Sequence, residues 1–437
     1  MADSMPASLP SMQALAGLAA RVGQCYAGAL SAKAAFFYPS NVVVMRQTFE
    51  APSSSSSKRG VAGATSVPWT IRCVPALLDK AREKAAKGSS APGGPAAAAP
   101  AAAPAPASSS SSSSQGGGTS GQNPKDVFSP PYDDRLLVSD DQATHRGYTI
   151  LLNKFCVVPR HFLLVTRDFE PQSQPPAPAM LALAYKIVHA HARLADAGAT
   201  DDVGRGKELL AFYNCGSVSG ASQPHQHLQF AEVGNEERET DQAKGTTTAA
   251  YRYKVPIEAL LDRIEHDGKE QDTVHALPLP YQHFVVLLGR GQQLVGADDD
   301  AQLSDYLGNK LLGLLDALFQ ARISAAAAAA QAADAPQPTE RRGPPSWNLL
   351  LTTRAMHLVP RQKEEFDGLK EPKAGHDDDE AVGSLSINSL GYAGHLLVKS
   401  DRELAALQAY PGGVEAVLAS TGVPPVADVT TASGPGP

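Results

Sequence analysis

The stretch from position 219 to position 230 constrains the fold of this chain more than any other. It reads Ser-Gly-Ala-Ser-Gln-Pro-His-Gln-His-Leu-Gln-Phe, a loop of small residues followed by alternating polar and apolar side chains. Successive side chains of an extended strand point to opposite faces, so Leu228 and Phe230 are expected on one face. His225, His227 and Gln229 then share the other face, about 7 Å apart along the strand. The sequence therefore predicts a small-residue loop that leads into a strand with one polar face.

This polar face carries the residue types that chemistry at phosphorus requires. A neutral imidazole is a nucleophile at pH 7 and can attack a phosphoryl group. Backbone N–H groups can approach phosphoryl oxygens closely where the loop residues are small. Glutamine is uncharged, so Gln229 can donate hydrogen bonds to those oxygens without taking up a proton. These residues predict a phosphoryl-transfer site at which one of the two histidines attacks.

The rest of the chain predicts two sets of strands and helices. An amphipathic helix carrying Met12, Leu15, Leu18, Ala19 and Val22 comes first. The first set has strands at 148–152, 156–166, 209–214 and 225–233 and a helix at 178–194. The second has strands at 282–288, 347–351 and 356–359, a helix at 303–323, and a final strand pair at 385–389 and 394–398 before a helix from residue 402. This order favours an α+β fold with antiparallel sheets.

Two low-complexity segments interrupt this pattern. Residues 88–122 are almost wholly Ala, Pro, Ser and Gly, and they predict a disordered insert because they cannot bury enough apolar surface to offset their ordering entropy. Residues 324–340 begin as a polyalanine continuation of a helix and end in an Ala/Pro/Gln stretch. Smaller polar inserts are expected at 52–63, 234–248 and 363–381. Such inserts are tolerated at loop tips.

Composition excludes several classes of protein. The net charge is −7 and no dense basic patch occurs, which argues against nucleic acid as a partner. No apolar run approaches the roughly 18 residues of a membrane span. The four cysteines lack paired or metal-type spacing, so we expect reduced thiols, no metal site and a cytoplasmic protein. Residues 1–37 are poor in acid and rich in Ala and Ser, so an organelle transit peptide stays an alternative.

The motif at 225–229 resembles that of a known superfamily. His-x-His-x-Gln is similar to the motif of the transferase branch of the histidine-triad superfamily, whose hydrolases have a third histidine in place of glutamine. The longer stretch 212–222, Phe-Tyr-Asn-Cys-Gly-Ser-Val-Ser-Gly-Ala-Ser, resembles the fungal-type ATP adenylyltransferases, or diadenosine tetraphosphate phosphorylases. Three further stretches match the same family, at 75–80, 151–159 and 347–361. Four matches in the expected order make the resemblance specific, although short motifs alone recur by chance.

The resemblance implies a fold and a set of site residues. It implies two related histidine-triad-like half-domains that pack as a pseudo-dimer, with residues 1–240 holding the reactive motif and residues 241–437 completing the nucleotide site. His227 would be the nucleophile that forms an adenylyl-histidine. The substrate-binding residues would be Lys80, Asn153, Lys154, Asn214, Ser219, Gly220, Ala221, Ser222, Gln229, Thr352, His357 and Arg361. His357 departs from the family, in which this position is usually apolar.

The expected activity is phosphorolysis of diadenosine tetraphosphate to ADP and ATP, which in reverse is an ATP adenylyltransferase reaction. Two alternatives stay open: a related transferase acting on a nucleotide sugar, and a non-catalytic dinucleotide-binding sensor. We expect a monomer with no tightly bound cofactor, which meets magnesium only with the nucleotide phosphates. His161, His275 and His283 lie near apolar runs without alternating partners, and they are predicted to be structural.

Overall fold

The computed structural model describes residues 9–49, 65–76, 126–140, 147–196, 207–234, 255–266, 271–297, 299–331, 344–370 and 381–425. Lys80 and the whole insert 88–122 lie outside the described residues, as do 52–63, 235–248 and 332–340. Among the described residues no helix is both long and apolar enough to cross a membrane.

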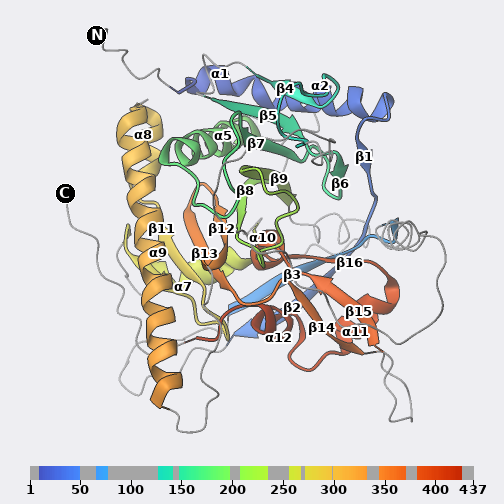
Figure 1. Ribbon diagram of the computed structural model, residues 1–437, viewed down its shortest axis with the longest axis vertical. Helices are drawn as coiled ribbons and strands as arrows, with labels where there is room; N and C mark the ends of the chain where they lie inside the picture. The colour runs from blue at the N-terminus through green and yellow to red at the C-terminus, as the bar shows by residue number, and fades with distance from the viewer. Residues whose placement is uncertain are drawn as a thin grey trace, which may run out of the picture.

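One antiparallel sheet of nine strands runs through the molecule (Figure 1). Its order is β10 (Val274–Ala276), β11 (Phe284–Leu287), β13 (Ala355–Arg361), β12 (Ser346–Leu351), β8 (Lys207–Cys215), β9 (His227–Gly234), β7 (Phe162–Thr166), β5 (Tyr148–Leu152) and β4 (Leu137–Ser139). The pairing of β8 with β12 joins strands from the two parts of the chain, and Asn214 lies opposite Asn348 at this seam. The predicted antiparallel α+β fold is therefore confirmed.

Helices cover one face of this sheet. They are α1 (Met12–Ala16), α2 (Leu18–Ser31), α5 (Pro178–Asp196), α8 (Gly291–Ala297) and α9 (Asp300–Gln331). Their apolar stripes pack on the alternate residues of the strands, including Leu228 and Phe230 of β9, to form one large core. Figure 1 shows α9 running along one side of the molecule and α1 and α2 lying across the β4–β7 end.

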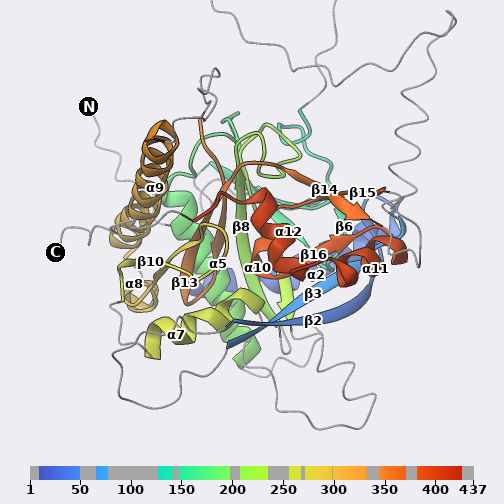
Figure 2. The ribbon, with the colours of Figure 1, turned by 90° about the horizontal axis from the view of Figure 1, so that it is seen from below.

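The other face is covered by smaller elements. A three-stranded sheet of β2 (Asn41–Phe49), β3 (Thr65–Cys73) and β16 (His395–Val398) packs there, as Figure 2 shows, with η1 (Pro256–Leu260) and α10 (Ser389–Ala393). Around these lie α7 (Leu261–His266), α11 (Asp401–Ala409), α12 (Gly413–Thr421) and the pair β14 (Glu365–Lys370) and β15 (Ala381–Ser386). A second core fills this layer and includes Phe212 and Ala231 from the large sheet.

Most predicted strands and helices are confirmed, with several differences. The predicted polar insert 363–381 is wrong in its first part, because residues 365–370 form β14 by pairing with β15. The strand predicted at 156–166 is divided into β6 (Phe155–Cys156), which pairs with β1 (Phe36–Phe37), and β7, because the turn between them contains Arg160 at a positive φ of 56°. The predicted final strand pair is wrong, since β15 pairs with β14 and β16 pairs with β3. The first helix divides at Gly17. β2 and β3 were not predicted, and β9 begins at His227, two residues later than expected.

Candidate active site

His227 is the first residue of β9 and its ring is 98% buried, with a relative exposure of 2%. Its Nδ1 lies 2.8 Å from the backbone oxygen of His225. A carbonyl oxygen only accepts, so Nδ1 carries the proton and donates it. The lone pair is therefore on Nε2, which has no hydrogen-bond partner among the described residues. This tautomer is the one that a nucleophilic imidazole needs.

Burial also sets the charge of this ring. It lowers the pKa of His227 to about 4, opposed by the hydrogen bond to the His225 carbonyl and assisted by repulsion from His225. A charged ring is disfavoured away from water, so the imidazole is neutral at pH 7. The same residue thus has both the proton position and the charge state required for attack.

His225 is held by hydrogen bonds to two other parts of the chain, and one of its partners is a residue that the sequence did not reveal. Its Nδ1 lies 2.7 Å from Oδ2 of Asp126, and its Nε2 lies 2.7 Å from the backbone oxygen of Thr166 on β7. Because it precedes β9, it makes only an isolated bridge, with Pro171. No spacing in the sequence connects position 126 with position 225, so no signal pointed to Asp126.

Gln172 is a second supporting residue that the sequence did not reveal. Its Oε1 accepts from the backbone N of His227 at 2.7 Å, and its Nε2 donates to the backbone oxygens of Asn214 at 2.8 Å and His227 at 3.2 Å. The β8–β9 ladder ends at the pair Phe212 and Gln229. The side chain of Gln172 therefore bridges the two backbones where the ladder stops and fixes the position of His227.

Gln229 lies two residues beyond His227 on the same face and is half-buried. Its Oε1 is 3.1 Å from Nε2 of His161, and Nδ1 of His161 is 3.0 Å from Nδ2 of Asn153. The structure thus brings Asn153 and Gln229 together through His161. His161 was predicted to be structural, and both of its ring nitrogens do have protein partners; the turn at 157–161 places this ring beside Gln229 of β9.

The small-residue loop is held by glycines and by the second part of the chain. Gly216 and Gly220 have φ angles of 89° and 84°, which favour glycine. Ser219 is buried, its Oγ donates to the backbone oxygen of Gly216 at 2.8 Å, and its own backbone oxygen accepts from Asn348 at 2.9 Å. Ala221 is half-buried and Ser222 is exposed. The exposed end of the loop is the part open to a ligand.

Two predicted binding residues, Asn214 and Arg361, are occupied by the protein itself. Oδ1 of Asn214 accepts from Asn348 at 2.8 Å and from Oγ of Ser389 at 2.7 Å. Nη1 of Arg361 donates to Oδ1 of Asn348 at 2.6 Å, and its Nη2 donates to the backbone oxygen of Lys363 at 2.6 Å. Both side chains are buried. These side chains connect β8, β12 and β13 beneath the loop, so the second part of the chain helps to fix the position of the loop.

The remaining predicted residues lie apart. Thr352 is buried at the other end of β12, with its Oγ1 donating to Glu258 of η1 at 2.5 Å. His357 is buried in β13, with its Nδ1 3.0 Å from Nε2 of His283. Lys154 is exposed beside Asn153, with its Nζ 5.7 Å from the ring centroid of Phe155. The structure does not bring Thr352 or His357 into contact with His227 or Gln229.

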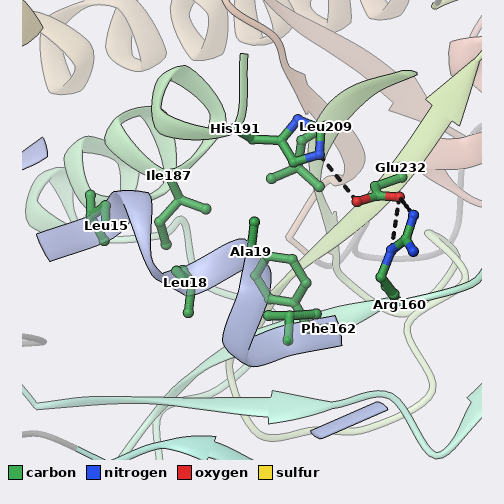
Figure 3. A pocket seen from close by; sticks show the side chains of 10 residues that line it. Leu15, Leu18, Ala19, Arg160, Phe162, Ile187, His191, Leu209 and Glu232 are labelled. Atoms are coloured by element: carbon green, nitrogen blue, oxygen red, sulfur yellow. Dashed lines mark hydrogen bonds and ion pairs between the residues drawn. The ribbon is translucent and has the colours of Figure 1, made fainter. Parts of the chain in front are cut away.

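A small cavity lies on the opposite face of β9, beneath α1 and α2 (Figure 3). Figure 3 shows Arg160 and His191 both directed at the carboxylate of Glu232. Nε of Arg160 lies 3.1 Å from Oε2 of Glu232, and Nε2 of His191 lies 3.1 Å from Oε1. Side chains alternate along a strand, so Glu232 faces away from His227 and Gln229. Through Arg160, this cluster fixes the turn at 157–161 to the face of β9 that lies opposite His227.

No group of three or more His, Cys, Asp or Glu is placed to hold a metal ion within the described residues.

Comparison with known families covers both parts of the chain. Residues 108–243 match the family model described as the Ap4A phosphorylase N-terminal domain, and residues 277–424 match that of the ATP adenylyltransferase C-terminal domain. In Saccharomyces cerevisiae, diadenosine 5',5'''-P1,P4-tetraphosphate phosphorylase 2 is 30% identical over 312 residues, which are 70% of this chain and 78% of the relative. Protein APA1 of the same organism is 26% identical over 314 residues, with the same coverage.

Solved structures show the same fold. The crystal structure of yeast Ap4A phosphorylase Apa2 matches with a TM-score of 0.52 and 22% identity, covering 94% of this chain and 98% of that one. Its complex with AMP gives a TM-score of 0.54 at 20% identity, covering 97% of this chain and 100% of that one.

Proposed function

The chain belongs to the family of Ap4A phosphorylases, or ATP adenylyltransferases, and from that premise we propose that it catalyses phosphorolysis of diadenosine tetraphosphate at His227. The observation that carries the proposal is the state of this ring, which is neutral, with Nδ1 donating to the His225 carbonyl and Nε2 available. The family relationship identifies the enzyme as a nucleotidyltransferase. The neutral ring with Nε2 available supports Nε2 of His227 as the attacking atom.

The reaction proceeds in two displacements. Nε2 of His227 attacks the α-phosphorus of one adenosine, the bond from that phosphorus to the bridging oxygen breaks, and ATP leaves. An oxygen of inorganic phosphate then attacks the adenylyl-histidine, the phosphorus–nitrogen bond breaks, and ADP leaves. The ring is positively charged while it carries the adenylyl group, and the hydrogen bond from Nδ1 to the His225 carbonyl stabilises that charge.

The proposal includes two related half-domains, at 1–240 and 241–437, packed as a histidine-triad-like pseudo-dimer. The strand order supports it. From the β8–β12 seam outward, the order β8, β9, β7, β5 is matched by β12, β13, β11, β10. These two sets of four strands also share their chain order: two strands, a long helix (α5 or α9) and two more strands. Only the first half carries His-x-His-x-Gln.

The loop at 219–222, Gln229, Lys154 and Lys80 are proposed to hold the polyphosphate, since small residues, an amide and ammonium groups suit anionic oxygens. Magnesium is proposed to arrive bound to the nucleotide phosphates, as part of the substrate. The protein is proposed to be a monomer without a resident cofactor. Asn214, Arg361, Thr352 and His357 contact protein groups in this structure, so their proposed contribution is to shape the site.

Product analysis tests the proposal directly. The protein is incubated with diadenosine tetraphosphate with and without inorganic phosphate. A phosphorylase gives ADP and ATP only when phosphate is present. AMP and ATP without phosphate would identify a hydrolase, and no product at all would identify a binding protein; either result contradicts the proposal.

His227→Ala is expected to abolish turnover while dinucleotide binding, measured by calorimetry, changes little, because the nucleophile serves chemistry and the loop serves binding. His275→Ala is the matched control, since His275 is on the edge strand β10 and bonds Oγ1 of Thr273. In the absence of phosphate, label from diadenosine tetraphosphate labelled at its α-phosphorus should be retained on wild-type protein as an acid-labile, base-stable adduct. Near wild-type activity of His227→Ala, or label on another residue, would remove the mechanism.

A further inference from the structure

We infer that His161 is a positioning residue that orients the amide of Gln229, so that the Nε2 group of Gln229 faces the reacting phosphoryl oxygens. The inference rests on the proposed function for its chemical meaning. It follows from the order of hydrogen bonds that leads from Phe155 through Asn153 and His161 to Gln229.

The first step is the orientation of Asn153. Its Nδ2 lies 3.3 Å from the backbone oxygen of Phe155 as well as 3.0 Å from Nδ1 of His161. A backbone carbonyl can only accept, so the Asn153 atom that faces it must be the donor nitrogen. The amide of Asn153 is therefore fixed with its N–H groups toward His161.

The second step is the tautomer of His161. Because Asn153 donates to Nδ1, that nitrogen carries the lone pair and the ring proton is on Nε2. Burial lowers the pKa of His161 to about 4, so the ring is neutral at pH 7 and Nδ1 is free to accept. Nε2–H then donates to the atom of Gln229 that lies 3.1 Å away, which must be its carbonyl oxygen.

The third step is the consequence for Gln229. With Oε1 engaged by His161, the two N–H bonds of Nε2 project from the other side of the amide, and Nε2 has no partner among the described residues. Gln229 is only half-buried and shares its strand face with His227. The amide thus presents a pure donor to an anionic phosphoryl group. A flipped amide would present an acceptor there and repel the same oxygens.

Several contacts hold the turn that carries the His161 ring. The backbone N of Asn153 donates to the backbone oxygen of His161 at 2.9 Å, and this bond joins the two ends of the segment between β5 and β7. Sγ of Cys156 lies 3.0 Å from the backbone oxygen of Asn153. On the opposite face, Arg160 is paired with the buried Glu232. A preorganised donor is worth more than a mobile one, because no reorganisation is needed as charge develops.

A double-mutant cycle tests the inference. His161→Phe keeps a planar aromatic ring, somewhat larger than imidazole, and removes both hydrogen bonds; it is combined with Gln229→Ala. We expect His161→Phe to lower kcat for phosphorolysis about 10- to 100-fold, below the 10²–10³-fold typical of losing a whole donor, with KM changed less than about threefold. In the Gln229→Ala background, His161→Phe should cause no further loss, because His161 acts only through Gln229. A full additional loss in the double variant would overturn the inference.

A second measurement reads the tautomer of His161 in the wild-type protein and needs a variant only to assign the signal. Selective ¹⁵N labelling of histidine and NMR at pH 7 should show His161 neutral and protonated at Nε2, with the assignment made by the signal lost in His161→Phe or, if that variant does not fold, in His161→Gln. A proton on Nδ1, or on both nitrogens, would overturn the inference. The NMR measurement needs no substrate. If the product assay showed no phosphorolysis, the proposed function would be rejected, but the tautomer of His161 could still be determined.

Discussion

Two histidine rings of the site are held in opposite tautomers. In each case a backbone carbonyl sets the tautomer, directly for His227 and through the Asn153 amide for His161. His227 donates from Nδ1 to the His225 oxygen, whereas His161 accepts at Nδ1 from an amide fixed by the Phe155 oxygen. Backbone carbonyls cannot change roles, so both tautomers are set by the fold. Burial keeps both rings neutral.

The pKa values of these rings predict the acid limb of the adenylylation rate. Both lie near 4, so the neutral forms predominate above that pH, and the rate should fall only as the pH approaches 4 from above. An unperturbed histidine would give a limb near 6.5. The measurement is single-turnover adenylylation by diadenosine tetraphosphate without phosphate, because this avoids the titration of inorganic phosphate. A limb between pH 6 and 7 would contradict the assignment.

Among the elements, the loop between β8 and β9 depends most on backbone conformation. Gly220 has a positive φ, and a Cβ there would lie 2.8 Å from Cβ of Asn388, the residue before α10. The loop is thus pressed against a helix from the second part of the chain. Its neighbour Ser219 is tied to Asn348 on β12. The shape of the small-residue loop is therefore decided by both parts of the chain together.

Gly220→Ala is expected to raise KM for the dinucleotide severalfold and to destabilise the fold by about 1–3 kcal/mol, because the methyl group adds a clash to an unfavourable φ. Gly147→Ala is the matched control. Gly147 has a similar φ of 82° with open space around it, so it should cost only about 1 kcal/mol and leave KM unchanged. The readouts are steady-state kinetics and thermal unfolding. Equal KM values for the two variants would show that the loop tolerates the shift.

For the whole molecule, buried neutral histidines link stability to pH. The pKa is lowered by burial for six of them: His161, His189, His227, His283, His357 and His395. Their unfolded value is about 6.5, so between pH 6.5 and about 4 the unfolded chain binds more protons than the folded one. Stability therefore falls as the pH is lowered through this window, by about 1.4 kcal/mol per pH unit for each group.

We expect Tm to be roughly 10–20 °C lower at pH 5 than at pH 7.5, measured by calorimetry at constant ionic strength. His395→Leu is an informative variant, since both ring nitrogens of His395 are buried without a hydrogen-bond partner in the part of the chain that the structure describes. It should raise Tm, and more at pH 5 than at pH 7.5, because one proton-binding group of the unfolded chain is removed. A Tm independent of pH from 5 to 7.5 would reject the linkage.

The sequence by itself determined the features that depend on local pattern. Alternation in 227–230 predicted β9 and its two faces, and the sequence predicted a helix at 303–323, which lies within α9. The motif at 225–229, with the ordered matches around it, indicated the family and led to the prediction that His227 is the nucleophile. These follow from neighbouring residues, because side-chain direction and chemistry are read along a single strand or helix.

Only the tertiary structure decided which distant residues meet. Asp126 and His225 are 99 positions apart, and His161 and Gln229 are 68 apart, yet each pair shares a hydrogen bond. Asn214 and Arg361 were expected to contact the ligand, but the β8–β12 pairing places them against Asn348, where protein donors and acceptors occupy them. The contacts of Asn214 with Asn348 depend on the register between β8 and β12, which lie more than a hundred residues apart in the chain. No local sequence pattern records that register.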